Sequence, residues 1–168
     1  MKKKFPLIDQ FVKKASVLRF MMNLWPVFRG SGIWIDYMKD DYSEMQVSLG
    51  LSFFNSNIFG VHFGGSLYSM VDPFIVTLLT PRLGSKYYCW DYSGKIRYVK
   101  PGTGKVSAHI KIPEQTVQTI IEKASTGEKV LHKCEILIKD ESNHIVAIVT
   151  KTVYVRLKER FRAQLHTE

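Results

Sequence analysis

Residues 64–79 read GGSLYSMVDPFIVTLL, and this stretch decides the fold of the chain. Its apolar side chains recur every three or four residues, which predicts one long helix over residues 64–79 with a wide buried face. Pro73 lies inside this pattern, where it removes a backbone donor and clashes with the preceding turn. We therefore expect a kink or local break just after Asp72. The residues of the apolar face are Leu67, Met70, Val71, Phe74, Ile75, Leu78 and Leu79.

The segments on either side of this helix have the composition and alternation of β-strands. Strands that follow one another without alternating helices favour an antiparallel sheet, so the class is α+β. The expected strands cover residues 32–38, 45–51, 87–92, 95–99, 106–112, 129–139 and 145–155. A short helix is expected over residues 114–124. An amphipathic N-terminal helix is expected over residues 5–23, ended by Pro26 and Gly30.

The 168 residues fit a single domain over 1–168, with a core of about 32–155 and a polar C-terminal tail. Cys89 and Cys134 have no partners at zinc-ligand spacing and are interpreted as reduced core thiols. No metal or cofactor is expected. The net charge of +9 comes from scattered residues without a nucleic-acid motif. Without a signal peptide or an apolar run of membrane-spanning length, we expect a cytoplasmic protein with neither nucleic acid nor membrane as partner.

The chemistry of the chain is expected in residues 55–72, which combine a polar loop, two glycines at a helix start, and a carboxylate. The first N–H groups of a helix have no internal partner, and the helix dipole is positive there. Gly64 and Gly65 would let a ligand approach those amides and polarise a thioester carbonyl. Asp72 lies about two turns further on, and its apolar surroundings should desolvate the carboxylate, which suits a general base.

These residues resemble a known family. Asn57 followed by the run His62-Phe63-Gly64-Gly65 and then by Asp72 is similar to the hotdog-fold acyl-CoA thioesterases of the phenylacetate-pathway type. The His-Phe-Gly-Gly form is closest to an uncharacterised thioesterase-like branch. The resemblance implies a curved antiparallel sheet wrapped around one long helix, and a homodimer or dimer of dimers whose site spans the interface. Two features depart from the family pattern: Phe63 is an extra residue, and a hydroxyl from the strand after the helix has only Ser93, or Asp91 instead.

The resemblance implies a role for each residue of the motif. The amides of Gly64 and Gly65 would hold the thioester oxygen, and Asp72 would activate water or attack the carbonyl directly. Asn57 would position water or substrate. The ligand would be an acyl-CoA or an acyl-carrier thioester, and basic side chains would bind its phosphates. The expected substrate-binding residues are Asn55, Phe63, Tyr68, Ser69, Arg97, Lys100 and Lys105.

Several residues also have simpler interpretations. Asp72 could cap the broken helix, the paired glycines could serve close packing, and Tyr68 and Ser69 could be simple neighbours. Asn55 could satisfy the loop backbone. His62 could pin the loop, or act with Asp72 as in the hotdog dehydratases. Two further functions remain open: a non-catalytic acyl-CoA-binding or regulatory module, and an interaction domain that binds nucleic acid through its charge.

Overall fold

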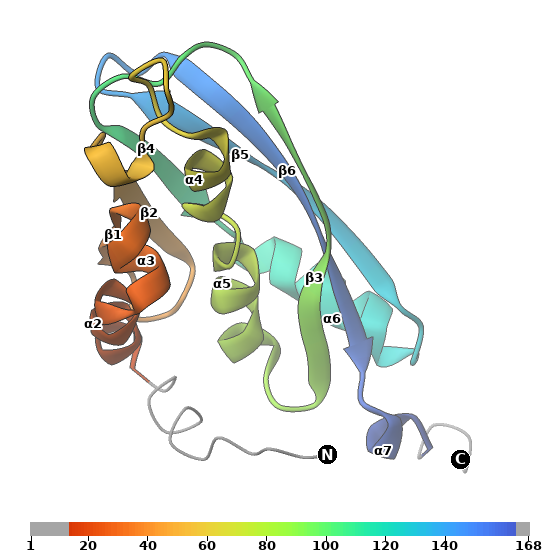
Figure 1. The fold of residues 1–168 in the computed structure, drawn as a ribbon. Coiled ribbons are helices and arrows are strands. Elements are labelled where there is room, and N and C mark those ends of the chain that lie inside the picture. The colour runs from red at the N-terminus through yellow and green to blue at the C-terminus, as the bar shows by residue number, and fades with distance from the viewer. Residues whose placement is uncertain (1–13, 164–168) are drawn as a thin grey trace.

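The computed structural model describes residues 14–163. Six antiparallel strands form one curved sheet in the order β1-β2-β4-β5-β6-β3, and two helices, α4 and α5, lie along its concave side (Figure 1). A curved sheet wrapped around a central helix is the hotdog fold, so that expectation is confirmed. The strands are β1 (Ile33–Met38), β2 (Glu44–Leu49), β3 (Tyr87–Tyr98), β4 (Val106–Lys111), β5 (Val130–Asp140) and β6 (Ile145–Leu157).

The central helix is broken, as Pro73 predicts. α4 (Gly64–Ser69) ends before a turn at residues 70–73, and α5 (Phe74–Leu83) continues beyond it. The predicted apolar face is almost completely buried, with Met70, Val71 and Phe74 each at 0% exposure. The break turns the chain at Asp72, so the carboxylate lies at the junction of two helices and not within one.

The N-terminal region differs from its prediction. α2 (Ala15–Leu24) is the part of the expected helix that lies within the described residues; residues 5–13 lie outside them. Pro26 does not end the helical region, because it opens a second helix, α3 (Pro26–Ser31). Proline suits the first position of a helix, where its missing N–H would have no partner.

Helix α2 covers the outer edge of β1. The side-chain amide of Asn23 donates to the Ile35 carbonyl at 3.1 Å and accepts from the Ile35 N–H at 2.8 Å. Arg19 donates to the Asp36 carbonyl at 2.8 Å. Backbone groups that an edge strand would leave open are thereby satisfied. β3, at the other end of the sheet, is the edge that remains.

β3 is one long strand, and the prediction of two strands at residues 87–92 and 95–99 is wrong. Its register against β6 shifts between Asp91 and Ser93, which makes Tyr92 the extra residue of a β-bulge. Side chains alternate across a strand, so one extra residue reverses which of them face inward. Asp91 before the bulge and Gly94 after it consequently share the inner face.

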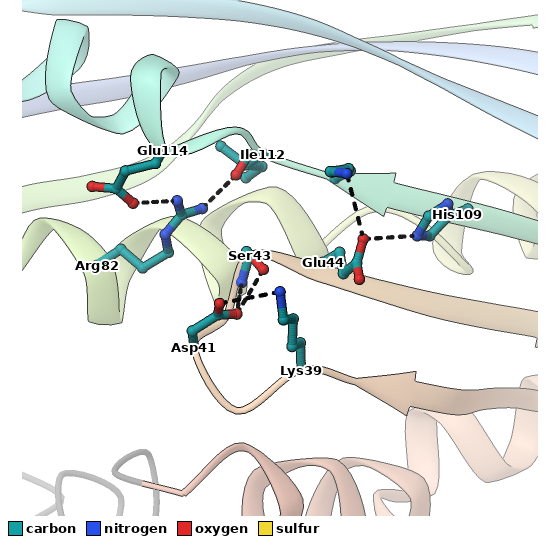
Figure 2. Close-up of polar contacts among 9 residues, drawn as sticks. Lys39, Asp41, Ser43, Glu44, Arg82, His109, Ile112 and Glu114 are labelled. Carbon is teal, nitrogen blue, oxygen red and sulfur yellow. Dashed lines mark hydrogen bonds and ion pairs between the residues drawn. The ribbon is translucent and has the colours of Figure 1, made fainter.

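Arg82 anchors the end of α5 to the start of α6 (Glu114–Ser125), as Figure 2 shows. Its guanidinium donates to the Ile112 carbonyl at 2.7 Å and pairs with Glu114 at 2.8 Å. The polar C-terminal region forms one short helix, α7 (Glu159–Arg162), and residues 164–168 lie outside the described part. Arg82 thus fixes the C-terminal end of α5 to the start of α6.

Candidate active site

Asp72 lies on the wall of an apolar groove of about 570 Å³ between the N-terminal helices and α5. Its side chain is 44% exposed, so the expectation of a desolvated carboxylate is wrong. The helix break turns the carboxylate outward while the apolar neighbours of Asp72 face the core. The groove is lined by Leu18, Met21, Met22, Trp25, Val27, Phe28, Ser69, Asp72, Pro73, Val76, Thr77, Thr80 and Pro81.

A buried lysine forms an ion pair with the Asp72 carboxylate. Lys151 of β6 is 1% exposed, and its ammonium lies 2.6 Å from Oδ1 of Asp72 and 2.8 Å from Oδ1 of Asp91. Burial alone would lower the pKa of Lys151, but hydrogen bonds to the two carboxylates outweigh that effect and raise it. The ammonium therefore stays charged, and it ties the helix break to two strands of the sheet.

Tyr68 of α4 completes this cluster. Its hydroxyl oxygen lies 3.5 Å from Lys151 Nζ, and the lysine also lies 5.5 Å from the centre of the tyrosine ring. Burial raises the pKa of Tyr68 above 10.0, and the neighbouring Asp72 adds to this effect. Four side chains from α4, the helix break, β3 and β6 thus meet at one point; we call Tyr68, Asp72, Asp91 and Lys151 the lysine cluster.

The loop before α4 is held by asparagine side chains. Asn55 is 1% exposed; it accepts from the Ser52 N–H at 2.8 Å and donates to the carbonyls of Gly50 and Ser31 at 2.7 and 3.0 Å. It satisfies the loop backbone, and its use as a substrate contact is excluded in this arrangement because the side chain is buried and engaged. Asn57 accepts from the Phe59 N–H at 2.9 Å, and it is partly exposed.

His62 pins the same loop to the turn before β4. Its ring is 3% exposed, and Nε2 lies 2.8 Å from the Gly104 carbonyl. Burial lowers the pKa of His62 below 6.5, so the ring is neutral at pH 7. Within residues 14–163 its polar partners do not include Asp72. The geometry favours the structural interpretation of His62 over the catalytic one.

The two glycines lie under aromatic side chains. A Cβ on Gly64 would come within 2.6 Å of the Tyr98 hydroxyl, and one on Gly65 within 2.5 Å of the Phe63 ring. Phe63 precedes α4, and its carbonyl accepts the N–H groups of Ser66 and Leu67. Among the described residues, the N–H groups of Gly64 and Gly65 have no acceptor. The helix start has the open amides that the sequence predicts, and Tyr98 is a neighbour that the sequence did not indicate.

These amides and Asp72 lie on different elements. Gly64 and Gly65 are the first two residues of α4, whereas Asp72 lies in the turn after that helix, seven residues beyond Gly65. Within residues 14–163, the polar contact of the Asp72 side chain is with Lys151 and not with either glycine.

The remaining predicted substrate residues are dispersed. Ser69 lines the groove, although its hydroxyl donates to the Gly65 carbonyl at 2.8 Å. Phe63 is 57% exposed beside the glycines. Lys100 pairs with Asp140, and Lys105 lies 3.8 Å from Asp36. Arg97 is exposed, on the face of β3 opposite to Tyr98. The structure does not bring the three basic residues to Asp72.

Lys151 is the residue that the sequence interpretation missed, although a signal was present. In β6, Val149, Val153 and Val155 are all 0% exposed, and alternation puts Lys151 on the same inner face. A lysine on a buried face requires an anionic partner.

Cys89 and Cys134 are free thiols, and burial raises the pKa of each to about 11. Within residues 14–163, no group of three or more His, Cys, Asp or Glu side chains is placed to hold a metal ion.

Comparison with known families decides the membership of the chain. The model of a family described as a domain of unknown function, DUF4442, matches residues 13–155. The chain belongs to the DUF4442 family. No curated protein matches this DUF4442 chain. Among its described residues, no helix has both the length and the apolar composition needed to cross a membrane.

Solved structures share the fold of this DUF4442 protein. PA5026 of Pseudomonas aeruginosa, described as a protein of unknown function and probable thioesterase, has a TM-score of 0.74 at 15% identity, with 85% of this chain and 95% of that chain covered. The thioesterase HI1161 of Haemophilus influenzae has a TM-score of 0.62 at 15% identity, covering 85% and 90%. PaaI of E. coli, from the phenylacetic acid degradation operon, has a TM-score of 0.60 at 16% identity, covering 84% and 91%.

Proposed function

We propose that this protein is a thioesterase that hydrolyses an acyl-CoA or an acyl-carrier thioester. The observation that carries the proposal is the position of Asp72, an accessible carboxylate on the wall of an apolar groove. An apolar channel with one fixed polar group suits a substrate with an apolar tail and a reactive end. The thioesterases among the solved structures of the same fold support this choice of reaction.

In the proposed reaction, Asp72 accepts a proton from water as the water oxygen attacks the thioester carbonyl. The carbonyl oxygen becomes negative, and the amides of Gly64 and Gly65 stabilise it. The C–S bond then breaks, and the leaving thiolate takes the proton back from Asp72. Direct attack by the Asp72 carboxylate, followed by hydrolysis of the resulting anhydride, is the other route open to the same residue.

The proposed active unit is a homodimer. The resemblance to hotdog thioesterases implies a site that spans the dimer interface, so the partner chain is proposed to supply the second half of each site. β3 is proposed as the joining strand, because the edge of β1 is covered by Asn23 and Arg19. β3 also exposes three large aromatic side chains: Trp90 at 47%, Tyr92 at 62% and Tyr98 at 54%.

A screen for thiol release tests the proposal. Acyl-CoAs of increasing chain length, together with aromatic acyl-CoAs, are offered to the wild type and to Asp72→Asn. We expect hydrolysis of at least one acyl-CoA, and a loss of about 100-fold or more in kcat for Asp72→Asn because the base is removed. Asp40→Asn is the matched control, since it changes an exposed aspartate in the β1–β2 turn. Equal turnover by Asp72→Asn would refute the assigned role.

A second candidate function is binding without cleavage. It is favoured by the ion pair itself, because Lys151 already occupies Oδ1 of Asp72 at 2.6 Å and competes with water for that oxygen. Calorimetry distinguishes the two functions: a binding module would bind an acyl-CoA while the screen releases no thiol. Absence of both binding and thiol release would exclude both functions.

A further inference from the structure

We propose that Lys151 is a positioning residue of this site, whose ammonium fixes the Asp72 carboxylate at the groove wall through a second anchor on Asp91. The inference rests on the proposed function, in which Asp72 is the catalytic carboxylate. Lys151 itself is 1% exposed and lines no part of the groove, so it acts through Asp72 and does not touch the substrate.

The first argument is the position of the ammonium between two carboxylates. It lies 2.6 Å from Asp72 and 2.8 Å from Asp91, and those side chains are 44% and 36% exposed. An ammonium has three donors, so it can hold both oxygens and still approach the Tyr68 hydroxyl at 3.5 Å. The ammonium of Lys151 is buried, while the carboxylates of Asp72 and Asp91 both reach solvent. This arrangement suits a cation that fixes a reacting carboxylate from the protein interior.

The second argument is that several departures from regular structure converge on this contact. The helix break at Pro73 brings Asp72 out of a continuous helix. The bulge at Tyr92 places Asp91 and Gly94 on one face, and Gly94 pairs with Lys151 across the sheet. Bulges re-aim side chains at functional sites. A purely stabilising apolar residue at position 151 would need none of these features, because valine fills the neighbouring inner positions.

The consequence for catalysis is geometric and electrostatic. Asp72 lies at a turn between two short helices, where its side chain would otherwise choose among several rotamers. A misplacement of about 1 Å costs on the order of 100-fold in rate. The ammonium also places a positive charge 2.6 Å from the carboxylate oxygen Oδ1. The charged and titratable groups that face this carboxylate are Lys151 of β6 and Tyr68 of α4. Asp91 of β3 and Cys134 of β5 face the ammonium of Lys151.

The test compares Lys151→Met with Lys39→Met. Methionine keeps the length of the side chain and removes its charge. Lys39 also pairs with an aspartate, Asp41 at 3.4 Å, but it is 49% exposed and far from the groove lining. For Lys151→Met we expect kcat to fall about 100-fold with KM within about threefold of wild type, because the groove is unchanged. Lys39→Met should change neither.

Two further variants separate positioning from simple stability. In an Asp72→Asn background, Lys151→Met should cause no additional loss of kcat, because Lys151 acts only through that carboxylate. Asp91→Asn keeps the buried lysine and removes one exposed anchor, so it should fold even if Lys151→Met does not, with kcat about tenfold lower. Wild-type kcat in Lys151→Met or in Asp91→Asn, measured per folded molecule, would overturn the inference.

A readout without substrate keeps this inference distinct from the proposed function. In protein labelled at aspartate, the ¹³C signal of the Asp72 carboxyl carbon is compared at pH 7 between the wild type and the variants. The signal should change position in Lys151→Met, which loses the ammonium that lies 2.6 Å from Oδ1 of Asp72, and stay in place in Lys39→Met. An unmoved signal in Lys151→Met would overturn the inference even in an active enzyme. A moved signal in a protein that hydrolyses no thioester would instead mean that the proposed function has failed while the contact between Lys151 and Asp72 stands.

Discussion

The hydroxyl of Tyr68 lies directly over the backbone of Gly94. A Cβ at position 94 would come within 1.8 Å of that oxygen, a separation that no side chain can tolerate. Because position 94 is a glycine, the side chain of Tyr68 has room to lie beside Lys151. We expect Gly94→Ala to push Tyr68 out of the lysine cluster and to lower the free energy of unfolding by about 1–3 kcal/mol. Urea denaturation measures this change.

Gly50→Ala is the matched control for that substitution. Gly50 directly follows β2, whereas Gly94 lies within β3, and a Cβ at position 50 would meet nothing within 4 Å. Its free energy of unfolding should stay within about 0.5 kcal/mol of wild type. A loss of equal size in both variants would contradict the assignment of the effect to the contact between Tyr68 and position 94.

The buried imidazole of His62 predicts how stability depends on pH. Burial holds the pKa of folded His62 below 6.5, whereas the unfolded chain has the ordinary value. Stability is therefore complete above that ordinary value and falls as the pH drops below it, because the unfolded chain then takes up a proton that the folded protein refuses. His62→Gln removes this titration, and glutamine retains a donor for the Gly104 carbonyl.

Urea denaturation between pH 5 and pH 8 checks the expectation. The wild type should lose stability below about pH 6.5 with a steeper slope than His62→Gln. His132, whose pKa burial also lowers, contributes to the wild-type slope and serves as the comparison through His132→Gln. Identical slopes for the wild type and His62→Gln would contradict the assignment of a neutral, loop-pinning histidine.

The open edge of β3 predicts which substitution changes the assembly. Tyr92 is 62% exposed at the bulge, and a lysine there would place a charge in any pairing of β3 with a second copy. We expect the wild type to have twice the mass of the 19.4 kDa monomer in light scattering after size exclusion, and Tyr92→Lys to have the mass of the monomer. Tyr37→Lys, on the covered strand β1, should leave the mass unchanged. If Tyr92→Lys still formed a dimer, the interface would not lie at the edge of β3.

The elements that sequence predicted well are those with a strong local pattern. The apolar face of residues 64–79 gave the central helix, and the position of Pro73 gave its break, since both effects act within a few residues. β3 was predicted as two strands because its aromatic and β-branched residues fall in two stretches, 87–92 and 95–99. The bulge that reverses the phase is set by pairing with β6, which is distant in sequence.

The site was predicted in part for the same reason. The free amides at Gly64 and Gly65 follow from the helix start, which is a local feature. The contact between Lys151 and Asp72 joins residues 79 positions apart, and no local pattern indicates it. What the alternation of β6 does indicate is a lysine on a buried face. Such a residue can therefore be recognised from sequence as needing an anion before the partner is known.

Asn23 and Arg19 occupy three backbone groups on the outer edge of β1, the N–H and carbonyl of Ile35 and the carbonyl of Asp36. A sheet with both edges open could add copies at each end and grow without limit, as in fibre formation. Here any pairing through β3 uses the remaining edge of both molecules at once, so growth stops after two copies. Two side chains of α2 thereby limit the number of copies that can join through the sheet.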